Sequence, residues 1–371
     1  MQDTTPNNEK PSGPLRYGWT TGTCATAAAR AAVEALWTGE FPDPVTVVLP
    51  NGSEVAFALA EHSLQSGSAR VAIIKDAGDD PDVTHGALVV ATVSAGPAGS
   101  GVTFKAGPGV GMVTRPGLAI PPGEPAINPV PRQMISAAIE AAAKLFSKTA
   151  DIAVEISIPG GQKIAEKTLN PRLGIVGGLS ILGTTGIVVP FSCSAWIHSI
   201  HRGIDVARAT GITHVAGATG STSEAAIAKL YNLADVALID MGDFAGGMLK
   251  YLKANPIARV TVAGGFAKMS KLAMGRMDLH SRRGVVDLDQ IAQWLCEAGA
   301  EPALVDEARG ANTAQQILGI AQGAGIDLAL VIAERARQAA AKTLAGSGIA
   351  LDVVVFDREG NLSGHSQVIK V

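Results

Sequence analysis

Short runs that alternate apolar residues with small or polar ones dominate the first half of the chain and predict β-strands. Between Val45 and Ile158 these runs read VTVVL, EVAFALA, ARVAIIK, ALVVATVS, GVTFK and IAVEISI. Two stretches break the alternation and predict helices: an alanine-rich one after Thr23, and RQMISAAIEAAAKLFSK from Arg132. Strands interrupted by two helices indicate an α+β domain.

From about Ile197 the pattern changes to strand, glycine turn and helix in succession. ITHVAGATGS precedes SEAAIAKLYN, DVALIDMGD precedes FAGGMLKYLKAN, and ARVTVAGG precedes FAKMSKLAMG, before further helical segments and a last strand, LDVVVFD. This alternation predicts a parallel sheet flanked by helices. We therefore expect a disordered tail over residues 1–14, an α+β domain over 15–195 and an α/β domain over 196–371.

The composition narrows the classes of function. Hydrophobic residues make up 47% of the 371 residues and the net charge is -3, so neither nucleic acid nor an anionic membrane is expected as a general partner. Cys24, Cys193 and Cys296 form no C-x-x-C pair, which favours a reducing compartment over disulfides or structural zinc. No apolar run approaches the roughly 20 residues that span a bilayer, and the N-terminus lacks a signal-peptide pattern. We expect a cytoplasmic protein.

The stretch GWTTGTCATAAARAA opens with three threonines and two glycines ahead of an alanine run. One hydroxyl is enough to cap a helix, so the surplus predicts a small or anionic ligand close to the backbone. LNPRLGIVGGLSILGTTGIVVP repeats the theme, and the two turns would line one pocket from opposite sides, unless each is only a tight turn. The candidate binding residues here are Thr20, Thr21, Gly22, Thr23, Thr184, Thr185 and Gly186.

The segment KDAGDDPDVTHG, residues 75–86, places four aspartates and a histidine directly after a predicted strand. Like charges raise one another's pKa in a buried pocket, so one carboxylate is a candidate general base or cation holder, with the histidine as a proton relay. A solvated acidic turn is the alternative, and the spacing is not that of an EF-hand. The candidate catalytic residues are Asp76, Asp79, Asp80 and His85.

Residues 105–132, KAGPGVGMVTRPGLAIPPGEPAINPVPR, form a long glycine- and proline-rich segment. Such loops are uncommon inside a domain unless they bind something, although a rigid proline-rich connector is the alternative. Glycines here would let a ligand reach the backbone, and arginines would face carboxylates. The candidate residues are Gly109, Gly111, Arg115 and Asn128.

In the second half, AGATGSTSE and AGGFAKMSK lie where a strand ends and a helix begins, which is where open α/β sheets bind ligands and where helix N-termini favour anions. Asp240 is placed to accept a hydrogen bond from a ribose or an ammonium group. Ser221 and Ser223 also read as helix N-caps, with Glu224 completing a capping box from Ser221. The candidate binding residues are Gly217, Thr219, Gly220, Ser221, Asp240, Gly264, Gly265, Lys268 and Lys271.

CSAWIHSIHRG places His198 and His201 three residues apart, with Cys193 nearby. A metal site would need further ligands, and no other Cys/His cluster supplies them. Three-residue histidine spacing is also common by chance on a helix. We therefore predict no metal site.

Four stretches, RYGWTTGTCATAAARAA, KDAGDDPDVTHG, GVGMVTRPGLAIPPGEPAINPVPR and LNPRLGIVGGLSILGTTGIVVP, closely resemble the CbiD family in order and spacing. These are the cobalt-precorrin-5B (C1)-methyltransferases of cobalamin biosynthesis. The resemblance covers the chain from Leu15 onward and is looser in the second half. It implies methyl transfer from S-adenosylmethionine to carbon 1 of a corrinoid, giving cobalt-precorrin-6A. It also implies a permuted ribosomal S5 domain-2-like α+β domain followed by an α/β domain.

Under this resemblance, the threonine–glycine turns would form N–H-rich walls against the polycarboxylate macrocycle or the methionine tail of the donor. The aspartates would accept the proton released around the methylated carbon, or orient the sulfonium. Neither the domain that holds the donor nor the choice between cobalt-bound and metal-free substrate is fixed by the sequence. A homo-oligomer and transient contact with neighbouring pathway enzymes stay open.

Two other functions compete with methyl transfer. Phosphoryl transfer is disfavoured because no G-x-x-x-x-G-K-[ST] motif is present. A corrinoid carrier without methyl-transfer activity predicts tight tetrapyrrole binding but no binding of S-adenosylmethionine.

Overall fold

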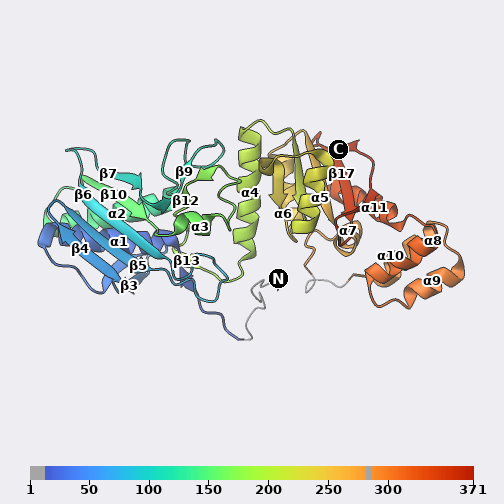
Figure 1. The fold of residues 1–371 in the computed structure, drawn as a ribbon, viewed down its shortest axis with the longest axis horizontal. Coiled ribbons are helices and arrows are strands. Elements are labelled where there is room, and N and C mark those ends of the chain that lie inside the picture. The colour runs from blue at the N-terminus through green and yellow to red at the C-terminus, as the bar shows by residue number, and fades with distance from the viewer. Residues whose placement is uncertain (1–12, 281–285) are drawn as a thin grey trace. The chain divides into compact units, whose positions relative to one another are not determined.

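The computed structural model describes residues 13–280 and 286–371, and the chain divides into two compact units, one ending at Cys193 and one running from Ser194 to Val371 (Figure 1). The sequence pattern places this boundary after residue 195. Of the tail predicted over residues 1–14, residues 1–12 lie outside the described residues. Each unit has its own hydrophobic core, so each is described by itself.

The first unit contains three helices and many short strands. The helices are α1 (Thr21–Thr38), α2 (Pro129–Phe146) and α3 (Gly161–Ala165). The strands are β1 (Gly18–Trp19), β2 (Val45–Val48), β3 (Glu54–Phe57), β4 (Glu61–Gln65), β5 (Ser68–Ile74), β6 (Leu88–Ala95), β7 (Val102–Ala106), β8 (Gly109–Val110), β9 (Met112–Val113), β10 (Ile152–Ser157), β11 (Ile175–Val176), β12 (Gly178–Leu179) and β13 (Ile187–Val188).

Five strands of this unit form one sheet in the order β4-β5-β6-β10-β7. Neighbours run antiparallel except β10 and β7, which are parallel. Along β10, Ile152, Val154 and Ile156 are buried while the residues between them are partly exposed, as a half-buried strand requires. Helices α1 and α2 supply the rest of the core on that face (Figure 1). The α+β order read from the sequence matches this arrangement.

Helix α1 begins at Thr21, so the predicted start after Thr23 is wrong, and the threonine–glycine stretch is the first turn of the helix. Thr20 is the N-cap, and its hydroxyl accepts the N–H of Thr23 at 3.2 Å. The alanines that follow are small enough to bring the helix close to the sheet and to α2. Helix α2 also begins before its predicted start at Arg132, because Pro129 has the fixed φ that suits a first helical turn.

The glycine-rich segment between β7 and α2 is held by short strand pairs. Strand β8 runs parallel to β12, and β9 runs antiparallel to β11. Similarly, β1 pairs with β13, which joins the two threonine–glycine turns. A segment that reads as a loop is thus fastened to residues about sixty positions further along the chain.

The second unit alternates strands and helices. Its helices are α4 (Cys193–Ala209), α5 (Ser221–Tyr231), α6 (Ala245–Ala254), α7 (Phe266–Ala273), α8 (Leu288–Glu297), α9 (Pro302–Arg309), α10 (Ala314–Gly323) and α11 (Leu328–Leu344). Its strands are β14 (His214–Ala218), β15 (Leu238–Asp240), β16 (Arg259–Gly265), β17 (Ala350–Phe356), β18 (Leu362–His365) and β19 (Ile369–Lys370).

The sheet of this unit runs in the order β15-β14-β16-β17-β18, and β19 also pairs with β17. The first four strands are parallel, as the alternating pattern predicts, whereas β18 and β19 are antiparallel to β17. Successive residues of the strands enter different cores: Val215 packs with α4 and α6, while Ala216 packs with α5. Helices therefore cover both faces of the sheet.

Helices α8, α9 and α10 follow α7 and share a core with α7 and α11. This arrangement brings the start of α10 to the sheet edge where α5 and α7 begin. Among the described helices, none is both long enough and apolar enough to cross a membrane.

Candidate functional site

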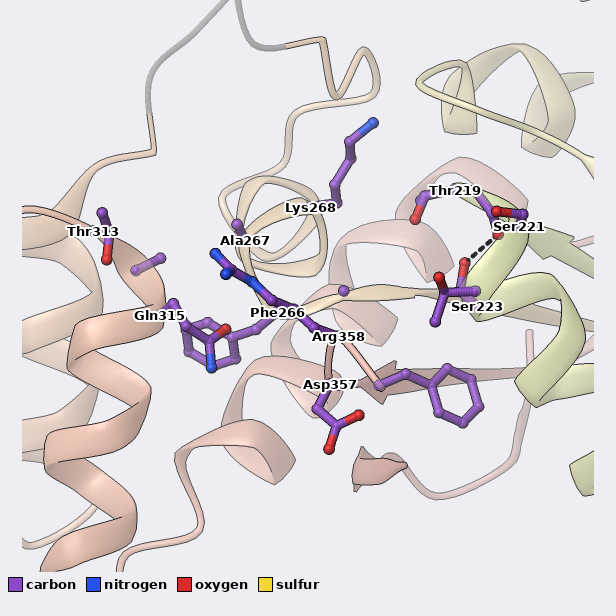
Figure 2. Close-up of a pocket in the computed structure, with 15 residues that line it drawn as sticks. Thr219, Ser221, Ser223, Phe266, Ala267, Lys268, Thr313, Gln315, Asp357 and Arg358 are labelled. Carbon is purple, nitrogen blue, oxygen red and sulfur yellow. Dashed lines mark hydrogen bonds between the residues drawn. The ribbon is translucent and has the colours of Figure 1, made fainter. Parts of the chain in front are cut away.

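An open pocket of about 500 Å³ lies in the second unit, where three parallel strands end (Figure 2). Residues 219–223 follow β14, residues 265–268 follow β16, and residues 356–358 end β17 and begin its hairpin. Residues 313–315, at the start of α10, complete the lining. The pocket is therefore assembled from four segments that are far apart in the sequence.

Five predicted binding residues line this pocket. They are Thr219, Gly220, Ser221, Gly265 and Lys268. Sequence reasoning missed the segments 313–315 and 356–358. The turn DREG was the available signal for the second of these, because it follows the end of β17 as the two glycine turns follow the ends of β14 and β16. The sequence pattern takes β17 for the last strand, which is wrong, since β18 and β19 come after it.

The strand order explains why a pocket forms here. After β14 the chain forms β15 on one side of it and later returns to form β16 on the other side. At such a reversal the connecting segments diverge to opposite faces and leave a crevice at the carboxyl ends of the strands, where open α/β sheets bind ligands. The turns 219–223 and 265–268 border that crevice.

The four candidate glycines of these turns differ in what surrounds them. A Cβ on Gly217 would lie 2.3 Å from the sulfur of Met248, and one on Gly264 would lie 2.7 Å from the hydroxyl of Thr219. A Cβ on Gly220 or Gly265 would meet no described atom within 4 Å. Their φ angles, 171° and -73°, are open to any residue. Packing thus requires glycine at 217 and 264, whereas the fold does not require it at 220 and 265.

Gly220 and Gly265 are also the N-caps of α5 and α7. Because glycine has no capping side chain, the first N–H groups of both helices keep hydrogen-bonding capacity toward the pocket. The predicted capping box from Ser221 to Glu224 is wrong, because Ser221 lies inside the helix. The prediction that Ser223 is an N-cap is also wrong, since its hydroxyl donates to the carbonyl of Gly220 at 2.9 Å.

Charged side chains stand at the edge of the pocket. Lys268 forms an ion pair with Asp243. Arg358 is exposed and forms no hydrogen bond or ion pair with the described residues. Asp357 accepts hydrogen bonds from the side chain and backbone of Asn361, which lower its pKa and keep it ionised at neutral pH. The pocket therefore offers helix N-termini and cations to an anionic group, with one carboxylate beside them.

Two other candidates of this unit lie outside the pocket lining. The ammonium group of Lys271 is buried and donates to the carbonyl of Leu279 at 3.0 Å, and burial lowers its pKa. Asp240 ends β15 at the same edge of the sheet, and its backbone carbonyl accepts from the indole of Trp196 at 3.1 Å. Lys271 thus fastens the segment that follows α7.

In the first unit, the two threonine–glycine turns lie against each other and are joined by hydrogen bonds. The N–H of Gly22 donates to the carbonyl of Leu182 at 3.0 Å, and the hydroxyl of Thr23 donates to that of Gly186 at 2.7 Å. Thr21 accepts the N–H of Leu182 at 2.9 Å. These bonds use buried groups that the sequence assigns to a ligand. The candidates Thr184 and Thr185 remain exposed.

Close packing accounts for the candidate glycines of the first unit. A Cβ on Gly109 would lie 1.8 Å from the carbonyl oxygen of Ile158, and one on Gly111 would lie 2.4 Å from a side-chain carbon. Cβ atoms on Gly22 and Gly186 would each lie 2.8 Å from a side-chain carbon. Protein atoms fill the space beside all four glycines, in contrast to the open space beside Gly220 and Gly265.

The carboxylates of the acidic segment bind other parts of the first unit. Asp76 holds the guanidinium group of Arg16 through both oxygens, and Asp79 accepts the backbone N–H of Arg16 at 2.7 Å. Asp80 accepts the N–H of Phe191 at 2.8 Å. The hydrogen bond from Arg16 is the main cause that lowers the pKa of Asp76 to about 2. Asp76 is therefore ionised at neutral pH and is a weak proton acceptor.

We expect Asp76 to make the stability of the first unit depend on acid pH. Its pKa in the folded chain, about 2, lies below the ordinary value of 3.8. The stabilisation is therefore complete above about pH 4 and is lost as the pH falls toward 2. Asp76→Asn should unfold at lower denaturant concentration at pH 6 and should show a flatter profile between pH 4 and 2. A profile that keeps the parent slope would contradict this assignment.

The remaining candidates of the first unit contact other residues of the same unit. The guanidinium group of Arg115 donates to the carbonyl of Arg172 at 2.8 Å. The side-chain amide of Asn128 donates to the carbonyl of Ile181 at 3.2 Å. The ring of His85 accepts a backbone N–H at 3.1 Å. The contacts of Arg115 and Asn128 join segments 57 and 53 residues apart, and the contact of His85 holds the acidic segment.

A buried lysine was not anticipated from the sequence. Lys75, at the end of β5, is 1% exposed, and its ammonium group lies 2.6 Å from the carboxylate of Asp82. Asp82 also accepts the N–H and the hydroxyl of Thr84. Burial raises the pKa of the nearby Cys24 thiol to about 12, so Cys24 is not a nucleophile at neutral pH. The pair between Lys75 and Asp82 anchors the acidic segment to the sheet.

His198 and His201 lie on α4, and the ring of His201 stacks on Tyr251 with centroids 3.9 Å apart. Burial lowers the pKa of His201, with a smaller contribution from His198. Within residues 13–280 and 286–371, no three His, Cys, Asp or Glu side chains gather as metal ligands would. A packing role explains the stacked histidine.

Comparisons with known proteins agree along nearly the whole chain. The family model CbiD matches residues 8–190, and the model of the CbiD C-terminal domain matches residues 278–367. A protein of Bradyrhizobium sp. (strain BTAi1) named cobalt-precorrin-5B C(1)-methyltransferase is 64% identical, over 95% of this chain and 93% of its own length. A protein of the same name from Brucella abortus (strain S19) is 58% identical, over 97% of this chain and 98% of its own length. The crystal structure of the cobalamin biosynthesis protein CbiD from Archaeoglobus fulgidus is 30% identical, covering 73% of this chain and 84% of its own, with a TM-score of 0.41.

Proposed function

The chain belongs to the CbiD family, and we propose that it methylates carbon 1 of cobalt-precorrin-5B, or of its metal-free counterpart, giving cobalt-precorrin-6A. The observation that carries this proposal is the high identity, over almost the full length, to relatives named for this reaction. S-adenosylmethionine is the methyl donor that we assign to it. For the first unit we further propose the permuted ribosomal S5 domain-2-like fold. The five-stranded sheet of this α+β unit supports that proposal.

The reaction needs positioning more than a reactive side chain. S-adenosylmethionine carries the methyl group on a positively charged sulfur. When the S–C bond breaks, the sulfur keeps its electron pair and S-adenosylhomocysteine leaves as a neutral thioether. The electron pair of carbon 1 forms the new C–C bond, and the macrocycle releases a proton. The chain therefore has to hold carbon 1 in line with the methyl group, exclude water and remove that proton.

We place the corrinoid on the first unit, with the proton acceptor in the acidic segment. Asp79, Asp80 and His85 are the candidate acceptors, because Asp76 is held ionised by Arg16 and has a low pKa. Two observations support this placement. Thr184 and Thr185 are exposed, and the chain that follows them runs through β13 to Phe191, whose N–H donates to Asp80 of the acidic segment.

The experiment is to incubate the protein with cobalt-precorrin-5B and S-adenosylmethionine carrying a ¹³C-labelled methyl group. We expect one labelled methyl per product molecule, at carbon 1 by NMR, with an equal amount of S-adenosylhomocysteine. Tight binding of the corrinoid without any transfer of label would overturn the proposal in favour of a carrier. ATP turnover in the absence of the methyl donor would overturn it in favour of phosphoryl transfer.

A further inference from the structure

We infer that the pocket at the ends of β14, β16 and β17 binds the methyl donor, S-adenosylmethionine, rather than the corrinoid. This inference rests on the proposed function, which requires a donor but does not say which unit holds it. It assigns the donor to the second unit (Figure 2).

The place and size of the pocket suit a nucleoside-sized ligand. It occupies the crevice that the strand order creates between β14 and β16, where open parallel sheets bind such molecules. Its volume of about 500 Å³ falls in the range of small-molecule sites. A corrinoid is a broad macrocycle with many carboxylate arms and needs a wider surface than this.

Two glycines keep space open inside the pocket that the protein does not fill. Gly220 and Gly265 have backbone angles open to any residue, and a Cβ on either would touch no described atom within 4 Å. Most of the other candidate glycines, such as Gly264, are explained by protein atoms within 3 Å of the Cβ position. Gly220 and Gly265 line the pocket, so the open space beside them lets a ligand approach the backbone there.

The chemistry of the lining matches the parts of the donor. The uncapped first turns of α5 and α7, with the exposed guanidinium of Arg358, suit the carboxylate of the methionine tail. The carboxylate of Asp357, which lines the pocket and also accepts hydrogen bonds from Asn361, suits the ammonium group. Groups that suit an anion and groups that suit a cation thus occur within one pocket.

The first unit has fewer groups available to bind the donor. Thr21 and Thr23, which the sequence assigns to the donor or the substrate, already bond to the opposite turn. The glycines at 109 and 111 are occupied by protein contacts. The groups that would hold a donor there would first have to leave their partners.

The test uses serine at the two open glycines. Serine is a better N-cap than glycine, so Gly220→Ser and Gly265→Ser should leave the melting temperature unchanged or raise it. The new hydroxyl would enter the pocket and accept the first-turn N–H groups. We expect calorimetry to show binding of S-adenosylhomocysteine weakened about tenfold or more, the effect of losing a hydrogen bond to a charged group. Arg358→Gln should weaken the same binding.

The matched control is Gly319→Ser, another glycine with open space, on the exposed side of α10 and outside the pocket lining. It should bind S-adenosylhomocysteine as the parent does. Parent-like binding in both pocket variants would overturn the inference and leave the proposed function standing. Weakened corrinoid binding with unchanged S-adenosylhomocysteine binding would also overturn it, by giving the pocket to the acceptor. Absence of donor binding in the parent, even with corrinoid present, would overturn the proposed function itself.

Discussion

Lys75→Met is expected to lower the free energy of unfolding by about 3–5 kcal/mol, because it leaves a buried carboxylate without its counter-charge. Lys75 is 1% exposed, and its ammonium group lies 2.6 Å from Asp82, whose side chain is 24% exposed. Burial raises the pKa of Asp82, but the charge and the hydrogen bond of Lys75 outweigh burial, so the pKa is lowered overall. The carboxylate is therefore ionised at neutral pH. Chemical denaturation at pH 7 measures the loss.

Two further variants separate this pair from an ordinary ion pair. Arg70 lies on β5, the strand that ends just before Lys75, and pairs with Glu61 at the surface, so Arg70→Met should cost about 1 kcal/mol or less. The double variant Lys75→Met/Asp82→Asn removes both charges and should recover part of the loss. Equal effects of the Lys75 and Arg70 substitutions would contradict the buried pair. The acidic segment would then need another anchor.

Asp352→Ala is expected to lower the free energy of unfolding of the second unit by about 3–5 kcal/mol. Asp352 is fully buried in β17. It accepts hydrogen bonds from the hydroxyls of Tyr231 at 2.6 Å and Thr261 at 2.7 Å, and from the guanidinium of Arg259 at 3.1 Å. Removing the carboxylate takes away the acceptor that these groups share at the centre of the network and leaves Arg259 without its counter-charge. Thermal or urea unfolding followed by fluorescence or circular dichroism measures the effect.

The matched control is Asp306→Ala on α9, whose carboxylate is 74% exposed and pairs with Arg309. The free energy of unfolding of that variant should stay within about 0.5 kcal/mol of the parent value. Asp352→Asn keeps the shape and some acceptor capacity, and should lie between the two. If Asp352→Ala were as stable as the control, the buried network would contribute no net stability.

The sequence predicts the elements of this fold better than their ends. Strand β10 alternates large apolar residues with small or polar ones, and this pattern predicts it. Strand β4, EHSLQ, was missed because both of its faces are largely exposed and it has no apolar period. The start of α1 was misplaced because Thr21 and Thr23 resemble cap residues, and only Thr20 has the extended backbone of a cap. Local pattern does not say which of several hydroxyls takes that role.

The candidate site depends on contacts that a single sequence does not display. Gly217 and Gly220 occur in one turn, but Met248 from α6 fills the space beside the first and nothing described fills it beside the second. Thr313 and Arg358 reach the pocket from separate segments. The sequence pattern located two of the four segments, because each is a glycine turn at a strand end. Of the other two, segment 356–358 carries the turn DREG as a sequence signal, and segment 313–315 follows from the folded arrangement alone.

The crystal structure of the protein with bound S-adenosylhomocysteine tests the central claim most directly. The account predicts the ligand in the pocket of the second unit, against the backbone of Gly220 and Gly265, with its carboxylate at the start of α5 or α7 and near Arg358. A ligand bound instead in the first unit, at the turn of Thr184 and Thr185, would contradict it.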